Sequence, residues 1–137
     1  MPELPEVEVV KQSLKKYILN KNISKIIVKN KKLRFPVPKD LSKKLSNIKI
    51  KKIQRISKYI VIQFEYELFL IIHLGMSGTL HLTPNEDHFQ NTNLSFYSSK
   101  NLPIKHNHIL FKFKNFFLIF NDPRRFGFIK LIYGKNK

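Results

Sequence analysis

Short apolar stretches separated by polar turns fill most of this sequence, and they restrict the possible fold more than any other feature. Period-two apolar patterns predict strands over residues 23–28, 59–64, 68–73, 79–82, 108–113, 116–120 and 128–132, with a further strand opening at Ile48 and Ile50. The polar residues 65–67 and 114–115 separate two adjacent pairs of stretches, which predicts two β-hairpins. Many short strands at this spacing predict two antiparallel sheets that pack face to face.

Helices are predicted beside these strands. Apolar residues recur at spacings of three and four near the N-terminus, at Leu4, Val7, Val10, Leu14 and Ile18. Pro5 and Glu6 suit a first helical turn, and Asn20 is expected to end the helix. A short second helix is predicted over 40–48, with Leu41 and Leu45 facing inward. The expected fold is therefore α+β but mostly β: a two-layer antiparallel β-sandwich flanked by helices.

Three segments lack a regular strand or helix pattern. Residues 33–38 are expected to be extended, because the residue before each proline avoids the helical region. Residues 85–101 are polar and turn-rich, which predicts an exposed loop. Residues 134–137 are expected to begin a linker, which leaves 1–133 as one domain.

The chain is strongly basic, with a formal net charge of +17 on 137 residues. Such a charge favours polyanionic partners: DNA, RNA or an anionic membrane surface. Lysine greatly outnumbers arginine, and asparagine and isoleucine are abundant, a mixture that AT-rich coding also produces without selection for binding. The few arginines are therefore more informative than the lysines, and they are Arg34, Arg55, Arg124 and Arg125.

Several protein classes are disfavoured by what the sequence lacks. No run of about 18 apolar residues is present, so we expect no membrane span. The opening residues lack the basic and apolar regions of a signal peptide. There is no cysteine, which excludes disulfides and thiolate-bound zinc in this sequence and favours a cytoplasmic location.

The N-terminus offers a route to covalent catalysis. Removal of Met1 would expose the secondary amine of Pro2, and an α-amino group has a pKa of roughly 7.7–8.0. Attack of that amine on a sugar carbon gives a cationic iminium, a form of Schiff-base catalysis. Glu3 could donate the proton that opens the sugar ring, and Glu6 could orient the group. Taken alone, however, these are also ordinary residues at the start of a helix.

Several motifs, which follow one another in the expected order along the chain, resemble those of the formamidopyrimidine-DNA glycosylase (Fpg) family. The opening MPELPEVE is similar to the start of these enzymes, and Leu4 favours them over the related endonuclease VIII enzymes, which typically have glycine there. Further along the chain, residues 56–59 resemble the family's catalytic-lysine strand, 73–78 its intercalation loop, 105–108 a phosphate-contacting segment and 121–127 its second probe loop. The resemblance covers nearly the whole chain.

The resemblance implies catalytic roles for two residues near the N-terminus and for one lysine in the segment that resembles the catalytic-lysine strand. Pro2 would be the nucleophile and Glu3 the proton donor. Lys58 would assist strand cleavage and bind a phosphate, which suits the mobile point charge of an ammonium group. Without the flanking match, Lys58 would be interpreted as a solvated strand lysine.

DNA-contacting roles follow from the same resemblance. Met76 would enter the space that a displaced base leaves, and Phe126 would be a second wedge. Arg124 would pair with the orphaned base, His106 would bind a phosphate, and Arg34 is a further candidate for a backbone contact. Each segment also has an interpretation without DNA. Met76 could fold back to fill the core, and residues 122–125 could form a turn with an ion pair between Asp122 and Arg125.

No metal site is expected in this chain. His106 and His108 would share one face if both lay on a strand, but two histidines without a nearby carboxylate or thiolate are weak evidence for a metal site. The family's structural zinc belongs to a C-terminal half with a helix–two-turn–helix module and a zinc finger, which this sequence does not contain. No cofactor is therefore expected here.

The resemblance implies a bifunctional DNA glycosylase/AP lyase that acts as a monomer. It would remove oxidised purines such as 8-oxoguanine and formamidopyrimidines from duplex DNA and would nick abasic sites by elimination. Two alternatives remain open from the sequence: a non-catalytic, basic DNA-binding remnant of such an enzyme, or a generic RNA-binding basic domain.

Overall fold

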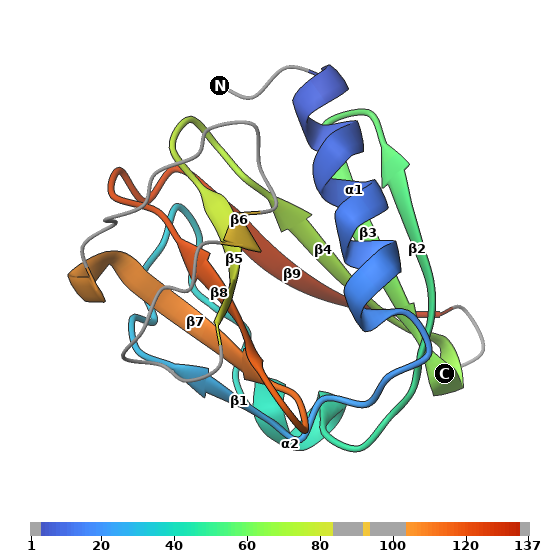
Figure 1. Ribbon diagram of the computed structural model, residues 1–137. Coiled ribbons are helices and arrows are strands. Elements are labelled where there is room, and N and C mark those ends of the chain that lie inside the picture. The colour runs from blue at the N-terminus through green and yellow to red at the C-terminus, as the bar shows by residue number, and fades with distance from the viewer. Residues whose placement is uncertain (1–3, 84–91, 94–103, 135–137) are drawn as a thin grey trace.

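A computed structural model describes residues 4–83, 92–93 and 104–134 of the chain (Figure 1). Pro2, Glu3 and nearly all of the predicted loop 85–101 lie outside the described residues. The elements are α1 (Leu4–Ile18), β1 (Lys25–Val28), α2 (Leu41–Leu45), β2 (Ile50–Ile56), β3 (Tyr59–Phe64), the 3-10 turn η1 (Glu65–Glu67), β4 (Leu68–His73), β5 (Thr79–Thr83), β6 (Thr92–Asn93), the 3-10 turn η2 (Ile104–His106), β7 (Asn107–Lys112), β8 (Phe117–Asn121) and β9 (Phe128–Tyr133).

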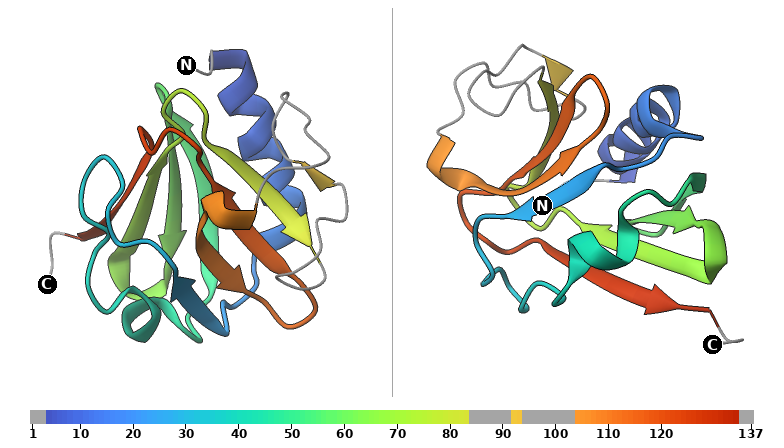
Figure 2. Two further views of the ribbon diagram at one scale, coloured as in Figure 1. Left: turned by 90° about the vertical axis from the view of Figure 1, so that its left-hand side faces the viewer. Right: turned by 90° about the horizontal axis from the view of Figure 1, so that it is seen from below.

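The strands form two antiparallel sheets, which confirms the predicted β-sandwich. One sheet has the order β1-β7-β8-β5-β6 and the other β2-β3-β4-β9. Figure 2 shows the two sheets as separate layers, with α1 along one open side between them. Among the described residues, no helix has the length and apolarity needed to cross a membrane.

Local sequence patterns account for most of these elements. The apolar face predicted for α1 is buried: Val7, Val10, Leu14 and Ile18 are at most 1% exposed. The predicted hairpin of β3 and β4 is confirmed, with Tyr59 opposite His73 and Phe64 opposite Leu68. The core between the sheets follows the period-two pattern that predicted the strands.

Two predictions about the segment before β2 were wrong in detail. Residues 33–38 form a bent loop rather than an extended segment, because Lys32 pairs with Pro36 and the Val37 N–H donates to the Lys31 carbonyl at 2.9 Å. The proline rule restricts single residues, and it does not keep a whole segment straight. The second helix is shorter than predicted, since Asp40 has a left-handed φ of 58° and the helix stops before Ser46.

The buried His81 couples the stability of the chain to pH. Burial in β5 lowers the pKa of His81 to about 4, and its Nε2 lies 2.6 Å from the Thr79 hydroxyl. Because the folded-state pKa is below the ordinary value of about 6.5, the unfolded chain binds more protons as the pH falls. The stabilisation is complete above about pH 6.5 and is lost progressively as the pH approaches 4.

We therefore expect the free energy of unfolding to fall by about 2 kcal/mol through His81 between about pH 7.5 and pH 5. Urea denaturation at both pH values measures this change in the wild-type chain and in His81→Gln, whose amide can still bond to Thr79. The variant should lose that part of the pH dependence. Equal pH dependence in both proteins would show that His81 does not carry it.

Candidate functional site

The candidate site lies at the end of the sandwich where α1 begins. Figure 1 places the start of α1, the β2–β3 turn and the β4–β5 loop at this end. Pro2 and Glu3 directly precede α1 in the sequence but lie outside the described residues. Glu6 lies in the first turn of α1, where a carboxylate complements the helix dipole.

The β4–β5 loop presents Met76 to solvent. Gly75 has a left-handed φ of 67°, and the Gly78 N–H donates to the Leu74 carbonyl at 2.8 Å, so the chain reverses within a few residues. The Met76 side chain at this turn is 44% exposed. The interpretation of Met76 as core filler is therefore wrong, and the side chain is available to a partner.

The β8–β9 loop presents Arg124 and Phe126 in the same way. Phe126 is 42% exposed, and the Arg124 guanidinium lies over its ring at 5.2 Å from the centroid. The ion pair between Asp122 and Arg125 that the alternative interpretation required is absent from this described loop. Arg125 instead has a left-handed φ of 58° and donates its N–H to the Asp122 carbonyl at 3.3 Å.

Asp122 holds these two loops together. Its buried carboxylate accepts hydrogen bonds from the Ser77 hydroxyl at 2.6 Å and from the Gly127 N–H at 2.8 Å. The Ser77 oxygen in turn accepts the Arg124 N–H at 3.1 Å. These hydrogen bonds fix the two loops relative to each other. Their exposed apolar side chains are therefore held in place, which suits insertion into a base stack.

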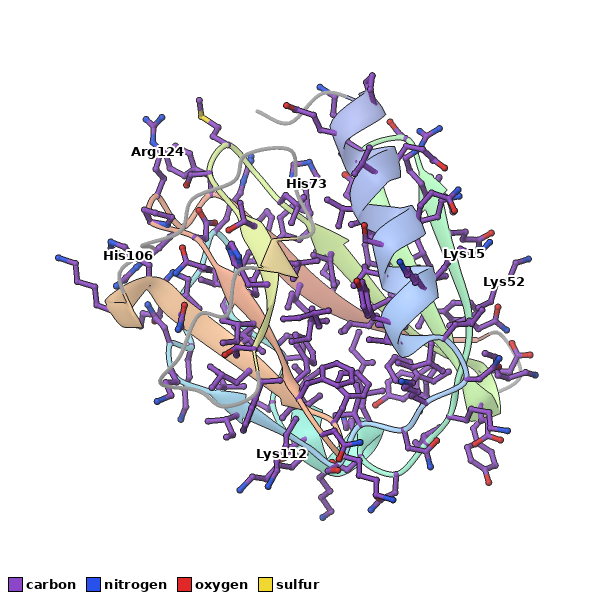
Figure 3. The ribbon with its side chains drawn as sticks, viewed as in Figure 1. Lys15, Lys52, His73, His106, Lys112 and Arg124 are labelled. Carbon is purple, nitrogen blue, oxygen red and sulfur yellow. The ribbon has the colours of Figure 1, made fainter. Side chains whose placement is uncertain are left out.

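The two histidines considered as a metal pair have different environments. His106 ends η2 and is half-buried, and Figure 3 shows it on the same side of the molecule as Arg124. His108 is fully buried in β7, with its Nε2 2.7 Å from the Asp122 carbonyl. His106 lies before β7 rather than within it, so the condition under which the two would share one strand face is not met. In the described ranges, no three His, Cys, Asp or Glu side chains are grouped as metal ligands.

His73 is a residue of this site that the sequence analysis named only within a loop motif. Its Nδ1 accepts the Gly75 N–H at 3.1 Å, so the neutral ring carries its proton on Nε2. The ring stacks on Phe128, with centroids 5.1 Å apart. The sequence did carry a signal for His73. Side chains alternate between the two faces of β4, which places His73 on the face opposite the core residue Ile72.

The positive charges of Arg34 and Lys58 both act on His73. Burial is the main cause that lowers the pKa of His73, and the charges of Arg34 and Lys58 lower it further. Arg34 is exposed on the bent loop and donates its N–H to the Gly127 carbonyl at 3.4 Å, while Lys58 lies in the β2–β3 turn. The structure thus brings two predicted site residues to one cationic region suited to phosphate.

Comparisons with known proteins point to one family. Residues 1–129 match the family model of the formamidopyrimidine-DNA glycosylase N-terminal domain. The chain is 38% identical to the formamidopyrimidine-DNA glycosylase of Laribacter hongkongensis over 128 residues, which cover 93% of this chain and 42% of the relative. It is 43% identical to that of Wolbachia pipientis wMel over 130 residues, which cover 94% and 43% of the two chains.

Solved structures show the same fold. Lactococcus lactis Fpg in complex with DNA containing an abasic site aligns with a TM-score of 0.78 and 30% identity, covering 98% of this chain and 45% of that one. The same protein with DNA containing N7-benzyl-Fapy-dG aligns with a TM-score of 0.77 and 31% identity, covering 96% and 44%. The chain spans less than half the length of the relatives that it matches.

Proposed function

The chain belongs to the formamidopyrimidine-DNA glycosylase family through its N-terminal domain, and we propose that it acts in the base-excision repair of DNA. The observation that carries the proposal is the pair of exposed apolar side chains, Met76 and Phe126, on two loops joined by Asp122. The proposed partner is duplex DNA with oxidised purines or abasic sites. The proposed activity is that of a bifunctional glycosylase and AP lyase.

The chemistry is proposed to begin at Pro2 after Met1 is removed. The amine of Pro2 attacks the C1′ atom of the damaged nucleotide, and the bond from C1′ to the base breaks with its electron pair leaving on the base. The departing base takes up the proton that the Pro2 nitrogen loses, so the nitrogen regains the electron pair that it needs to form the iminium. Glu3 gives a proton to the ring oxygen as the sugar opens, which leaves an iminium between Pro2 and C1′. Loss of a proton from C2′ then allows the 3′ phosphate to leave, which nicks the strand.

The cationic residues are proposed to hold the DNA backbone around this reaction. Lys58 precedes Tyr59, which pairs with His73 across β3 and β4, and it is proposed to bind a phosphate and assist the elimination. Arg34 and His106 are proposed to contact other phosphates, which fix the position of the duplex without reading its sequence. Arg124 is proposed to bind the base opposite the lesion through its planar guanidinium.

Borohydride trapping on a duplex with an abasic site tests the proposal, with intact mass to confirm that Met1 is absent. This substrate needs the amine but no pocket for a damaged base. A reduced protein–DNA adduct supports the proposed chemistry. A folded, DNA-binding chain that lacks Met1 and forms no adduct would be a binding remnant. Equal RNA binding, insensitive to Met76→Ala and Phe126→Ala, would indicate a generic RNA-binding domain.

Met76→Ala is expected to reduce the preference for an abasic duplex over an undamaged one by about tenfold, or about 1.4 kcal/mol. Displacing a nucleotide costs a few kcal/mol, and an inserted side chain offsets part of that cost. Fluorescence anisotropy with both duplexes measures the preference. Tyr66→Ala is the matched control, because Tyr66 is 76% exposed in η1, which lies at the opposite end of β4 from the β4–β5 loop. Equal losses in the two variants would contradict a specific role for Met76.

A further inference from the structure

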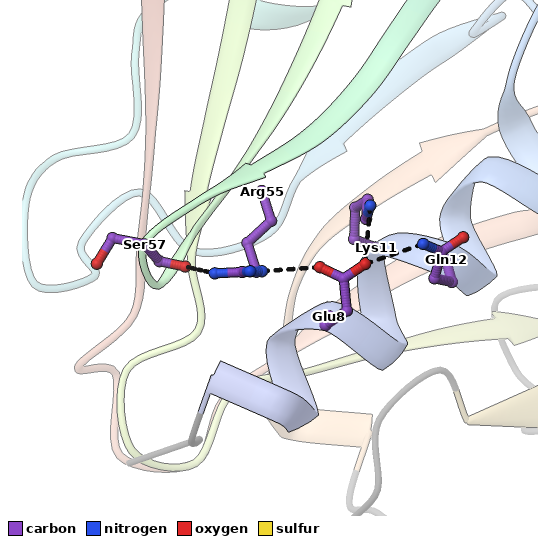
Figure 4. Close-up of polar contacts among 5 residues, drawn as sticks. All are labelled: Glu8, Lys11, Gln12, Arg55 and Ser57. Atoms are coloured by element: carbon purple, nitrogen blue, oxygen red, sulfur yellow. Dashed lines mark hydrogen bonds and ion pairs between the residues drawn. The ribbon is translucent and has the colours of Figure 1, made fainter.

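One arginine joins α1 to the strand that leads to Lys58. The Nε of Arg55, in β2, donates to the Glu8 carboxylate in α1 at 2.8 Å, across 47 positions of sequence (Figure 4). The second Glu8 oxygen accepts from Lys11 at 2.8 Å and from Gln12 at 2.9 Å, both within the same helix. Of these three partners of Glu8, Arg55 is the one that lies outside α1, so it joins the helix to β2.

The same guanidinium also holds the β2–β3 turn. Its Nη1 donates to the Ser57 carbonyl at 3.0 Å, and Ser57 has a left-handed φ of 54°. Lys58 follows Ser57 directly in the chain. A single planar group thus contacts both the helix that follows Pro2 and the turn that contains Lys58, and the two contacts use different nitrogens.

We propose that Glu8 and Arg55 are positioning residues, whose ion pair fixes the turn containing Lys58 relative to the N-terminal end of α1. The inference rests on the proposed function, in which Pro2 and Lys58 act on the same nucleotide. Pro2 lies two residues before α1, so the orientation of that helix end limits where its amine can reach. Neither Glu8 nor Arg55 needs to touch DNA for this role.

The ion pair is better suited to setting geometry than to adding stability. Both partners are partly exposed, Arg55 at 30% and Glu8 at 36%, and ion pairs of this kind contribute little to folding. Hydrogen bonds from Lys11, Arg55 and Gln12 lower the pKa of Glu8 to about 2, so the carboxylate is ionised at cellular pH. Rates, by contrast, are sensitive to displacements of about 1 Å between reacting groups.

Two substitutions and their combination test the role. Arg55→Lys keeps the charge but removes the fork that reaches Glu8 and Ser57 together, and Glu8→Gln removes the charge. We expect the single-turnover rate of borohydride-trapped adduct formation to fall about tenfold or more in each, with unchanged Kd for the abasic duplex and unchanged Tm. Because the two residues act as a pair, the double variant should be no slower than the slower single variant.

Lys11→Gln is the matched control, because Lys11 contacts the same carboxylate but only from within α1. Its trapping rate should equal that of the wild-type chain. Wild-type rates in Arg55→Lys, or additive losses in the double variant, would overturn the positioning role and leave the proposed function intact. A wild-type chain that lacks Met1 and forms no adduct would overturn the proposed function and this inference together.

Discussion

Replacing Pro2 with glycine is expected to reduce the borohydride-trapped adduct by about 100-fold or more, a loss typical of a misplaced or altered covalent catalyst. A secondary amine that condenses with the opened sugar gives a permanently cationic iminium. The primary amine of glycine gives an imine, which must also bind a proton before it can draw electrons in the elimination. Glycine also frees the φ angle that the proline ring fixes.

The comparison needs two controls. Intact mass must show that both proteins lack Met1, and both must bind the abasic duplex with similar Kd, since each keeps an ionisable amine at its N-terminus. Lys58→Ala measured in parallel identifies the other candidate amine. If Pro2→Gly formed adduct as fast as the wild-type chain while Lys58→Ala did not, Lys58 would be the nucleophile and the proposed chemistry would be wrong.

The strands and helices were predictable because their signals are local. The β3–β4 hairpin could be predicted to the residue, since its alternation and the polar residues 65–67 lie within one short segment. The loop 33–38 could not, because its shape depends on the pairing of Lys32 with Pro36. Proline restricts the neighbouring backbone angles and leaves the direction of such a loop to its packing.

The candidate site was predictable residue by residue but not as an arrangement. Motifs pointed to Met76, Arg124 and Phe126, yet nothing in the sequence indicated that Asp122 would bond to Ser77, 45 residues away, rather than pair with Arg125 beside it. The contact of Glu8 with Arg55 has the same character, since it joins a helix to a strand distant in sequence. Contacts of this kind follow from the packed fold rather than from local patterns.

Gly75→Ala is expected to have the largest effect on stability among the substitutions in the two loops, a loss of about 3 kcal/mol or more. A left-handed backbone costs a non-glycine residue about 1–2 kcal/mol, and Gly75 has a φ of 67°. A Cβ at this position would also lie 2.5 Å from the Gly127 nitrogen and 2.6 Å from the Phe126 carbonyl carbon. These are backbone atoms, so relief requires the two loops to separate. Urea denaturation measures the loss.

Two further variants separate the causes of that loss. Gly75→Asn accepts a positive φ more readily than alanine but places a Cβ in the same space, so it should be nearly as destabilised. A well-tolerated Gly75→Asn would show that backbone strain alone matters and that the loops need not approach so closely. Met76→Ala, one residue away and exposed, should change the free energy of unfolding by less than about 0.5 kcal/mol. If the close approach of the loops sets the interface, Gly75→Ala should lose both stability and preference for the abasic duplex, whereas Met76→Ala should lose only the preference.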